Sequence, residues 1–400
     1  MKPYQKICSG LLCCALLVAV SAAPARANLA ANTQIINQAQ LSYNDGVSTR
    51  TATASVTVTV GLVAAAPNIA PGPPQSTSYT GPGTILSDSY TVTAGANGPD
   101  TYNLTAAMTG STNTSGATAT STAPTVALGA TVTTIGSSTT VIVVPADGNL
   151  PGEMPGVNGI QVGDTLVING DTRTVAAISD NASGTSTITL NAALTGAAPG
   201  VGVLVAEQKV VTATVTAGTI TTSGTDVTVS ANMTATSVSS GGATTTSGSV
   251  LNTYTSGVAT LTKYVRNISV PSGSGVPYIY SGINYYPTGV TAKPGETLEY
   301  ILVANNSGAG AVSASVVTDV LPTGFVALKA NAYGAGKEVT YVSDTNVVTT
   351  LSAALDADAA NYVGPTLTVY VGTGATNVAG GSIPGGNRSV LVLYQVTLNP

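Results

Sequence analysis

Residues 51–60 read Thr-Ala-Thr-Ala-Ser-Val-Thr-Val-Thr-Val, an alternation with a period of two. Successive side chains of a β-strand point to opposite faces, so the Ala and Val residues would share one face and the Thr and Ser residues the other. The same pattern recurs at residues 209–216, 226–236, 298–304, 366–371 and 389–398. Clusters of Gly, Pro, Asn and Asp separate these stretches. The chain is therefore predicted to be all-β, built from tandem immunoglobulin-like β-sandwiches.

The first 27 residues have the features of a secretory signal peptide. Lys2 and Lys6 give a basic start, residues 11–20 are apolar, and Ala25-Arg26-Ala27 offers a small-residue cleavage site before Asn28. Neither this apolar run nor any later stretch is long enough to span a bilayer comfortably. We therefore expect a secreted protein, located outside a bacterial cell or on its surface, with no membrane span.

The residue types that usually carry catalysis are scarce. All three cysteines, Cys8, Cys13 and Cys14, lie in the expected signal peptide, and the chain contains no histidine. The mature chain would lack disulfides, thiolate metal ligands and a histidine base. No Ser-x-x-Lys motif occurs. We expect neither enzymatic activity nor a cofactor.

Charge is sparse and predominantly acidic. Only 7% of the residues are charged, with 12 Lys and Arg against 17 Asp and Glu. Three of the basic residues fall in the expected signal peptide, and the others are scattered along the chain. Because nucleic-acid binding needs a basic stripe to contact phosphates, we expect no nucleic-acid partner.

Composition divides the mature chain into three parts. Residues 28–66 hold N-terminal β-strands, and Pro67–Pro74 is predicted to be a linker because so many prolines cannot continue a sheet. A sandwich domain follows over residues 67–262, with a hairpin-rich β module inserted at about 124–206. A last sandwich covers residues 263–400.

The last part carries three distinctive pieces. They read Lys-Pro-Gly-Glu-Thr-Leu-Glu-Tyr at 293–300, Val-Ala-Asn-Asn-Ser-Gly at 303–308 and Val-Thr-Asp-Val-Leu-Pro-Thr-Gly-Phe at 317–325. In this order they resemble the conserved repeat domain of bacterial surface proteins catalogued as domain of unknown function eleven, which has an immunoglobulin-like fold. The resemblance covers Leu261 to the C-terminus. A fainter copy begins at Gly83, where residues 90–102 carry the likeness.

Repeats of that family usually close with a strand resembling "aGttItNtAtvsY", and residues 32–43 are similar to it. The resemblance implies that residues 389–398 form the penultimate strand of the last domain and lack their closing partner. Residues 32–43 would then be a donor strand, and residues 389–398 its acceptor. The donor residues are Ile35, Asn37, Ala39, Leu41 and Tyr43, and the acceptor residues are Val390, Val392, Tyr394, Val396 and Leu398.

Three arrangements of the N-terminal segment remain open. A neighbouring molecule could supply the strand, and this head-to-tail contact would not close, so a filament would grow. The same chain could supply it and form a closed monomer, or residues 28–66 could belong to the first domain. We predict a structural subunit of an extracellular fibre whose partner is itself. The alternative is a monomeric secreted adhesin that uses the inserted module to bind a ligand or other surface proteins.

A covalent link is a further expectation. The B-type domains of Gram-positive collagen adhesins, which have a related sandwich, join a lysine to an asparagine with help from a carboxylate. By this resemblance, Lys263 could bond Asn37, with Glu299 or Asp319 as the helper.

Calcium ligands are a last candidate. The acid-rich turns Asp344-Thr345-Asn346 and Asp356-Ala357-Asp358, and the residues Asp147 and Glu153, carry the oxygen ligands that calcium prefers. None of them has the full loop pattern of a calcium site.

Overall fold

A computed structural model describes residues 29–147, 156–181, 184–239 and 242–400. The expected signal peptide, residues 1–27, lies outside these ranges. The described residues form strands and no α-helix, so none of their segments is a helix that could cross a membrane. The predicted all-β fold, with tandem sandwiches, an inserted module and an N-terminal extension, is confirmed.

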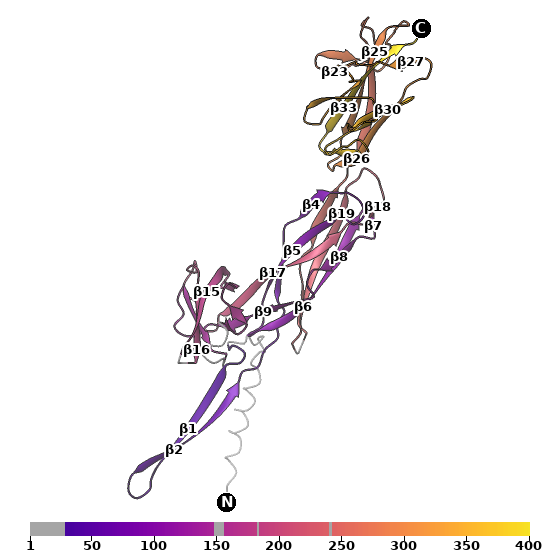
Figure 1. The fold of residues 1–400 in the computed structure, drawn as a ribbon. Coiled ribbons are helices and arrows are strands. Elements are labelled where there is room, and N and C mark those ends of the chain that lie inside the picture. Colours follow the sequence, from indigo (N-terminus) through magenta and orange to yellow (C-terminus); the bar gives the residue numbers. More distant parts are fainter. Residues whose placement is uncertain (1–28, 148–155, 182–183, 240–241) are drawn as a thin grey trace, which may run out of the picture.

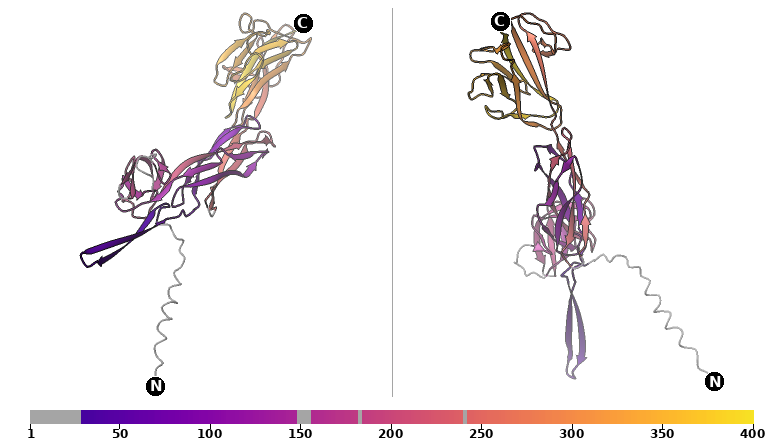
Figure 2. Two further views of the ribbon diagram at one scale, coloured as in Figure 1. Left: turned by 60° about the horizontal axis from the view of Figure 1, so that its bottom comes forward. Right: turned by 90° about the vertical axis from the view of Figure 1, so that its right-hand side faces the viewer.

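The molecule is elongated. A long hairpin projects from one end, the first sandwich and its inserted module lie in the middle, and the second sandwich forms the other end (Figure 1). The hairpin stands clear of both sandwiches in the two turned views as well (Figure 2). It consists of β1 (Gln34–Asn44) and β2 (Thr49–Thr59), which form a two-stranded sheet of their own.

The first sandwich has two large sheets. One follows the order β11 (Val141–Pro145), β16 (Thr185–Leu190), β15 (Asp171–Asn181), β14 (Thr165–Ile168), β17 (Leu204–Thr216), β5 (Ile85–Thr93), β3 (Asn68–Pro71), with β10 (Ala130–Val132) and β8 (Thr118–Ser121) paired to β17. The other follows the order β4 (Gln75–Ser78), β21 (Val250–Thr255), β19 (Val227–Ser237), β6 (Asp100–Thr112), β9 (Thr125–Leu128), with β20 (Thr244–Thr246) paired to β19. Two short pairs complete it, β7 (Thr114–Ser115) with β18 (Thr219–Ile220) and β12 (Gly156–Val157) with β13 (Ile160–Gln161). Tyr90, Tyr102 and Met233 are buried in the core of the sandwich.

The inserted module has a core of its own. Ile142, Leu166 and Ile188 are fully buried together in it. Strand β17 continues from the module into the sandwich, because its first residues pair with β14 and its last residues pair with β5. Strand β9 falls within the range expected for the module but pairs with β6 of the sandwich.

The prediction of a linker at Pro67–Pro74 is wrong in part. Asn68–Pro71 forms β3, which pairs with β5 at the edge of the sheet. An edge strand leaves one side of its backbone unpaired, so the missing N–H of Pro71 costs no ladder hydrogen bond.

The second sandwich also has two main sheets. The first sheet has the order β22 (Ala259–Asn267), β25 (Thr297–Asn306), β33 (Arg388–Leu398), β28 (Val339–Val342), β29 (Val348–Leu351), with β27 (Val326–Leu328) paired to β33. The second sheet has the order β30 (Ala360–Val363), β31 (Thr366–Tyr370), β26 (Val312–Val320), β32 (Gly381–Ile383). A hairpin of β23 (Tyr278–Tyr280) and β24 (Ile283–Tyr285) packs its tyrosines against the outer face of the first sheet.

Candidate assembly site

The β1–β2 hairpin has one apolar and one polar face. Its strands pair in register along their full length, from Gln34 opposite Thr59 to Asn44 opposite Thr49. Residues directly opposite each other share a face. We call one of these two surfaces the apolar face. It consists of Ile35, Asn37, Ala39, Leu41 and Tyr43 of β1 with Arg50, Ala52, Ala54, Val56 and Val58 of β2. The five predicted donor residues therefore lie together, and β2 doubles the width of the surface they form.

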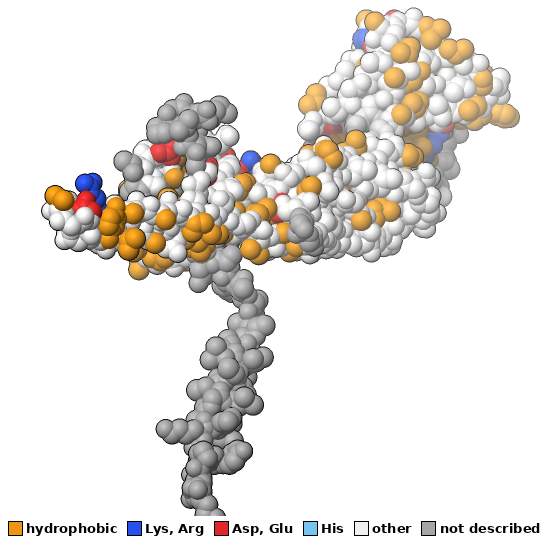
Figure 3. Space-filling view, turned by 90° about the horizontal axis from the view of Figure 1, so that it is seen from below, with side chains coloured by type: hydrophobic (Ala, Val, Ile, Leu, Met, Phe, Trp, Pro, Cys, Tyr) orange, Lys and Arg blue, Asp and Glu red, His pale blue; other side chains and the backbone are white. Residues whose placement is uncertain are grey.

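Every residue of both strands is exposed. Leu41 is 62% exposed, Val56 58% and Ile35 45%. Apolar side chains gather on this projecting end of the molecule (Figure 3). A lone two-stranded hairpin is marginally stable in water, and exposed apolar patches on soluble proteins usually mark interaction sites. The apolar face therefore has the character of an unpartnered binding surface.

The turn at the tip of the hairpin is held by its own side chains. Asp45 accepts hydrogen bonds from the N–H groups of Val47 and Ser48 and forms an ion pair with Arg50. The bond from Ser48, and then those from Arg50 and Val47, lower the pKa of Asp45 to about 2. Gly46 at the turn has φ of 90°, a left-handed conformation that favours glycine.

The base of the hairpin is fastened to the first sandwich by Asn97. Its side-chain amide donates to the carbonyl of Leu29 at 2.9 Å and to that of Gly61 at 3.4 Å, and its Oδ1 accepts from the N–H of Val63 at 2.7 Å. These partners lie on both arms that lead into the hairpin. Gly98 follows Asn97 and allows Ala31 to approach, since a Cβ at Gly98 would lie 2.5 Å from that of Ala31. The hairpin is thus anchored at its base and free along its length.

The predicted acceptor strand is wrong. Residues Val390, Val392, Tyr394, Val396 and Leu398 belong to β33, which lies in the interior of its sheet. One side of β33 pairs with β25, and the other side pairs with β28 and β27. A strand with both sides paired has no free edge to accept another strand. The expectation that residues 389–398 form a penultimate strand without its closing partner is wrong as well, because β33 already has a partner on each side.

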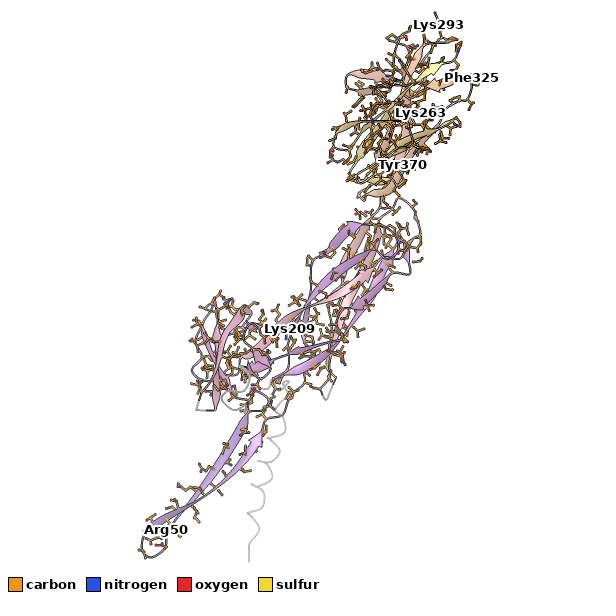
Figure 4. The ribbon with its side chains drawn as sticks, in the orientation of Figure 1. Arg50, Lys209, Lys263, Lys293, Phe325 and Tyr370 are labelled. Atoms are coloured by element: carbon orange, nitrogen blue, oxygen red, sulfur yellow. The ribbon has the colours of Figure 1, made fainter. Side chains whose placement is uncertain are left out.

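The hairpin does not complete the last domain of its own chain. Strands β1 and β2 pair only with each other among the described residues, so they join neither the first sandwich nor the second. Arg50 at the hairpin tip and Lys263 in the second sandwich lie at opposite ends of the molecule (Figure 4). Of the three arrangements, donation within the chain is therefore wrong here, and residues 34–59 are not part of the first domain's sheets.

Lys263 and Asp319 come together in the second sandwich. Lys263 Nζ lies 2.5 Å from Asp319 Oδ2, and its ammonium sits over the ring of Tyr300, 4.5 Å from the ring centre. The hydroxyl of Tyr394 also donates to Asp319. The side chain of Lys263 stays 41% exposed. Asp319, one of the two predicted helper carboxylates, therefore contacts Lys263. The predicted bond partner, Asn37, lies on the distant hairpin of the same chain.

Glu299 belongs to a separate buried network. Its carboxylate forms a 2.5 Å ion pair with Arg266 Nη2 and accepts hydrogen bonds from Tyr285, Tyr333 and Gln395 at 2.8 to 2.9 Å. Burial alone would raise the pKa of Glu299, but the bonds from these side chains outweigh it and hold the pKa below its usual value. Glu299 therefore fixes the β23–β24 hairpin onto the sheet and does not meet Lys263.

The candidate calcium ligands are engaged in turns. Asp356 accepts hydrogen bonds from Ser352 Oγ and the Asp358 N–H, and Asp358 accepts from the Ser352 N–H. The described residues contain no cluster of three acidic, His or Cys side chains that could hold a metal ion. Glu153 lies outside the described residues, and Asp147 accepts a hydrogen bond from the N–H of Asn158.

An open cavity of about 440 Å³ lies at the junction between the inserted module and the first sandwich. Asp100, Asp164 and Lys209 are among the residues that line it. Each has a partner within the chain: Asp100 binds the hydroxyls of Ser237 and Ser239, Asp164 accepts from the N–H of Gln161, and Lys209 pairs with Glu207. The charged side chains of the lining are therefore engaged within the chain.

Sequence patterns missed two parts of the site. Val56 and Val58 lie on the alternating stretch 51–60, but alternation alone does not predict that they pair with β1. The turn Asn44-Asp45-Gly46 between two strand patterns was the available signal for a hairpin. The role of Asn97 had no signal, because its partners Leu29, Gly61 and Val63 are far away in the sequence.

Comparison with known proteins adds little to this geometry. No family model and no curated protein matches the chain. Among solved structures, the chain is similar to the crystal structure of BcpA, the major pilin subunit of Bacillus cereus, with 11% sequence identity and a TM-score of 0.18. The match covers 71% of this chain and 68% of that one. The fold and the site described above rest on the contacts of this chain alone.

Proposed function

We propose that this protein is a structural subunit of an extracellular fibre or surface assembly. Subunits join head to tail when the β1–β2 hairpin of one copy docks onto the second sandwich of the next copy. The partner is the chain itself, the role is structural rather than enzymatic, and the location is the exterior of a bacterial cell. The assignment of residues 261–400 to the conserved repeat domain family is part of this proposal.

One observation carries the proposal: a hairpin of two 11-residue strands that projects from the molecule with its whole apolar face in water. Strand addition to another sheet would cover such a face and pair the open backbone edge of the hairpin. The hairpin and the second sandwich lie at opposite ends of the molecule (Figure 1). Each copy can therefore donate its hairpin at one end and accept the hairpin of another copy at the other end. A contact between unlike ends does not close, and repeated addition gives a filament.

Two charge-matched double variants test the proposal. Leu41→Asp with Val58→Asp places carboxylates on the apolar face, whereas Gln40→Asp with Thr57→Asp places the same charges on the opposite face. All four positions are exposed, so both variants should fold. Filaments in negative-stain images should disappear for the first variant and persist for the second. Filaments formed by both variants would contradict the docking of the apolar face. Loss of filaments in both variants would also contradict it, because added charge on either face of the hairpin would then block assembly equally.

The second candidate function is a monomeric adhesin that binds a ligand with the inserted module, and the cavity at the module junction favours it. The cavity is lined by Asp100, Asp164 and Lys209. Deleting the hairpin would leave such binding intact and would abolish assembly. This difference separates the two candidate functions.

A further inference from the structure

One side of the second sandwich is incompletely closed. On β22, Leu261, Lys263 and Val265 lie opposite Ala304, Leu302 and Tyr300 of β25, so they point toward the second sheet. Leu302 is buried against that sheet, yet Leu261 is 52% exposed. Within the described part of the chain, no strand therefore covers Leu261 on the inner face of β22.

The edge of the second sheet on that side is also open. Residues Val316–Val320 of β26 pair with β31 on one side. Strand β32 pairs with β26 at Val312 and Ser315, and no described strand pairs with residues 316–320 on the second side. Val320 is 65% exposed and Val316 44%. An unpaired strand edge beside exposed apolar side chains is a template for another strand.

The two open elements face each other. Lys263 on β22 and Asp319 on β26 form the ion pair that spans the space between the sheets. We call this space the seam, defined by Leu261, Lys263 and the edge of Val316–Val320. Beneath it, a crevice with no room for a water molecule is lined by Leu302, Val317 and Tyr394. The seam is thus closed in the single chain by one half-exposed side chain and not by a strand.

We infer that the seam is the acceptor for the β1–β2 hairpin of a second copy, a conclusion that rests on the proposed function. Strand β1 adds to the edge of Val316–Val320, and β2 lies beyond it over the inner face of β22. The apolar face then covers Leu261 and the rim of the core. We place β1 next to β26 because β1 carries the larger apolar residues, Ile35, Leu41 and Tyr43. These side chains gain the most free energy when they are buried against the core.

Polar complementarity fixes the register. Asn37 is the one polar residue among the five of β1 on the apolar face, and Lys263 with Asp319 is the polar spot in the seam. A buried amide needs hydrogen-bond partners, so the position of lowest energy places Asn37 beside this ion pair. The opposite face of the hairpin, which carries Gln, Thr and Ser side chains together with Ile36, then remains in water.

Single cysteines can test this placement cleanly, because all three native cysteines lie in the expected signal peptide. In the inferred register the outward-facing neighbour of Thr318 on the added strand is Gln38 if the strands run antiparallel, or Ile36 if they run parallel. Residues opposite each other in a sheet have Cα atoms ~4.5–5.5 Å apart, which suits a disulfide. Full mature chains carrying Gln38→Cys or Ile36→Cys are mixed with chains carrying Thr318→Cys under mild oxidation. All three positions are exposed, so these variants should fold.

Two controls test the register and the edge. Ser42→Cys lies on the same face of β1 but roughly 14 Å further along the strand than Gln38, at ~3.4 Å per residue. Thr349→Cys lies on β29, the exposed edge strand at the other side of the first sheet. We expect a heterodimer band on a non-reducing gel for Gln38 or Ile36 with Thr318, and no such band for either control.

Other outcomes overturn the inference in distinguishable ways. Filaments in the same preparations without a link to Thr318, or with a link to Thr349, would refute the seam and leave the proposed function standing. A link between Ser42 and Thr318 alone would refute the register set by Asn37. Absence of both filaments and links would refute the inference together with the proposed function.

Discussion

Lys263 Nζ lies 2.5 Å from Asp319 Oδ2, although the two residues belong to different sheets of the second sandwich. Lys263 also covers the ring of Tyr300, which stacks on Tyr394 at 5.3 Å. The pair joins an edge strand of one sheet to an unpaired edge of the other. It therefore marks the side of the sandwich where strand pairing is incomplete.

Asp319→Asn should destabilise the second sandwich only slightly. Lys263 is 41% exposed, so solvent screens its attraction to Asp319, and we expect a loss of about 1 kcal/mol in the free energy of unfolding. Urea denaturation of the monomeric protein measures this loss. A loss well above this value would mean that the ion pair is a core element and that the seam is tightly closed in the single chain.

Glu299→Gln should be far more damaging, because it leaves Arg266 without its carboxylate partner in a largely buried site. Breaking a buried pair by removing one partner costs about 3 kcal/mol or more. Hydrogen exchange in residues 263–400 measures the effect on this domain. Protection equal to that of the unaltered protein would contradict the structural role given to this network.

The stability of the same domain should depend on pH. Because the folded protein holds the pKa of Glu299 below its unfolded value, Glu299 contributes its full stabilisation above the unfolded pKa, about 4.3. That contribution is lost as the pH falls through the lower, folded pKa. Thermal denaturation over this acidic range should show a smaller decline for Glu299→Gln than for the unaltered protein. Equal slopes would argue against a depressed pKa.

Asn97→Ala should loosen the hairpin without unfolding the first sandwich. The substitution removes three hydrogen bonds that hold Leu29, Gly61 and Val63 at the hairpin base. Hydrogen exchange should accelerate in residues 29–63, and filament formation should weaken. Asn113→Ala is the matched control, since Asn113 binds Thr222 and Thr225 in a loop of the first sandwich. Equal effects of both variants on assembly would contradict the role of Asn97 as an anchor.

The covalent link between Lys263 and Asn37 remains a prediction, now between neighbouring copies. The Lys263 amine would bond the side-chain carbon of Asn37 and release ammonia, with Asp319 moving the proton. Boiled filaments should give a ladder on a denaturing gel, and the ladder should vanish in Lys263→Ala but not in Lys293→Ala. Monomer bands from unaltered filaments, with no mass loss of one ammonia per link, would show that docking is non-covalent.

Sequence patterns predicted the strands better than their partners. The alternation in residues 51–60 and the apolar residues Ile35 and Leu41 correctly indicated β2 and β1, because local periodicity reports which side chains share a face. Periodicity does not report the neighbour in a sheet. Residues 390–394 are five consecutive apolar residues, typical of a strand buried on both faces, but such a run does not identify the strands beside it, and β33 is paired on both sides. The acceptor was therefore misplaced.

The seam was not predictable for the same physical reason. Lys263 and Asp319 are 56 residues apart, and only the stacking of the two sheets brings them together. The exposure of Leu261 depends on the absence of a strand above it, which no local pattern records. Donor positions follow from alternation within one hairpin, whereas acceptor positions depend on the order of strands in the completed fold.

The most direct test of head-to-tail assembly is to compare the chain beginning at Asn28 with the same chain lacking residues 34–59. Sedimentation velocity combined with negative-stain imaging reports size and shape together. We predict filaments for the longer chain and soluble monomers for the shorter one. A longer chain that stays monomeric at high concentration and forms no filaments would contradict the account.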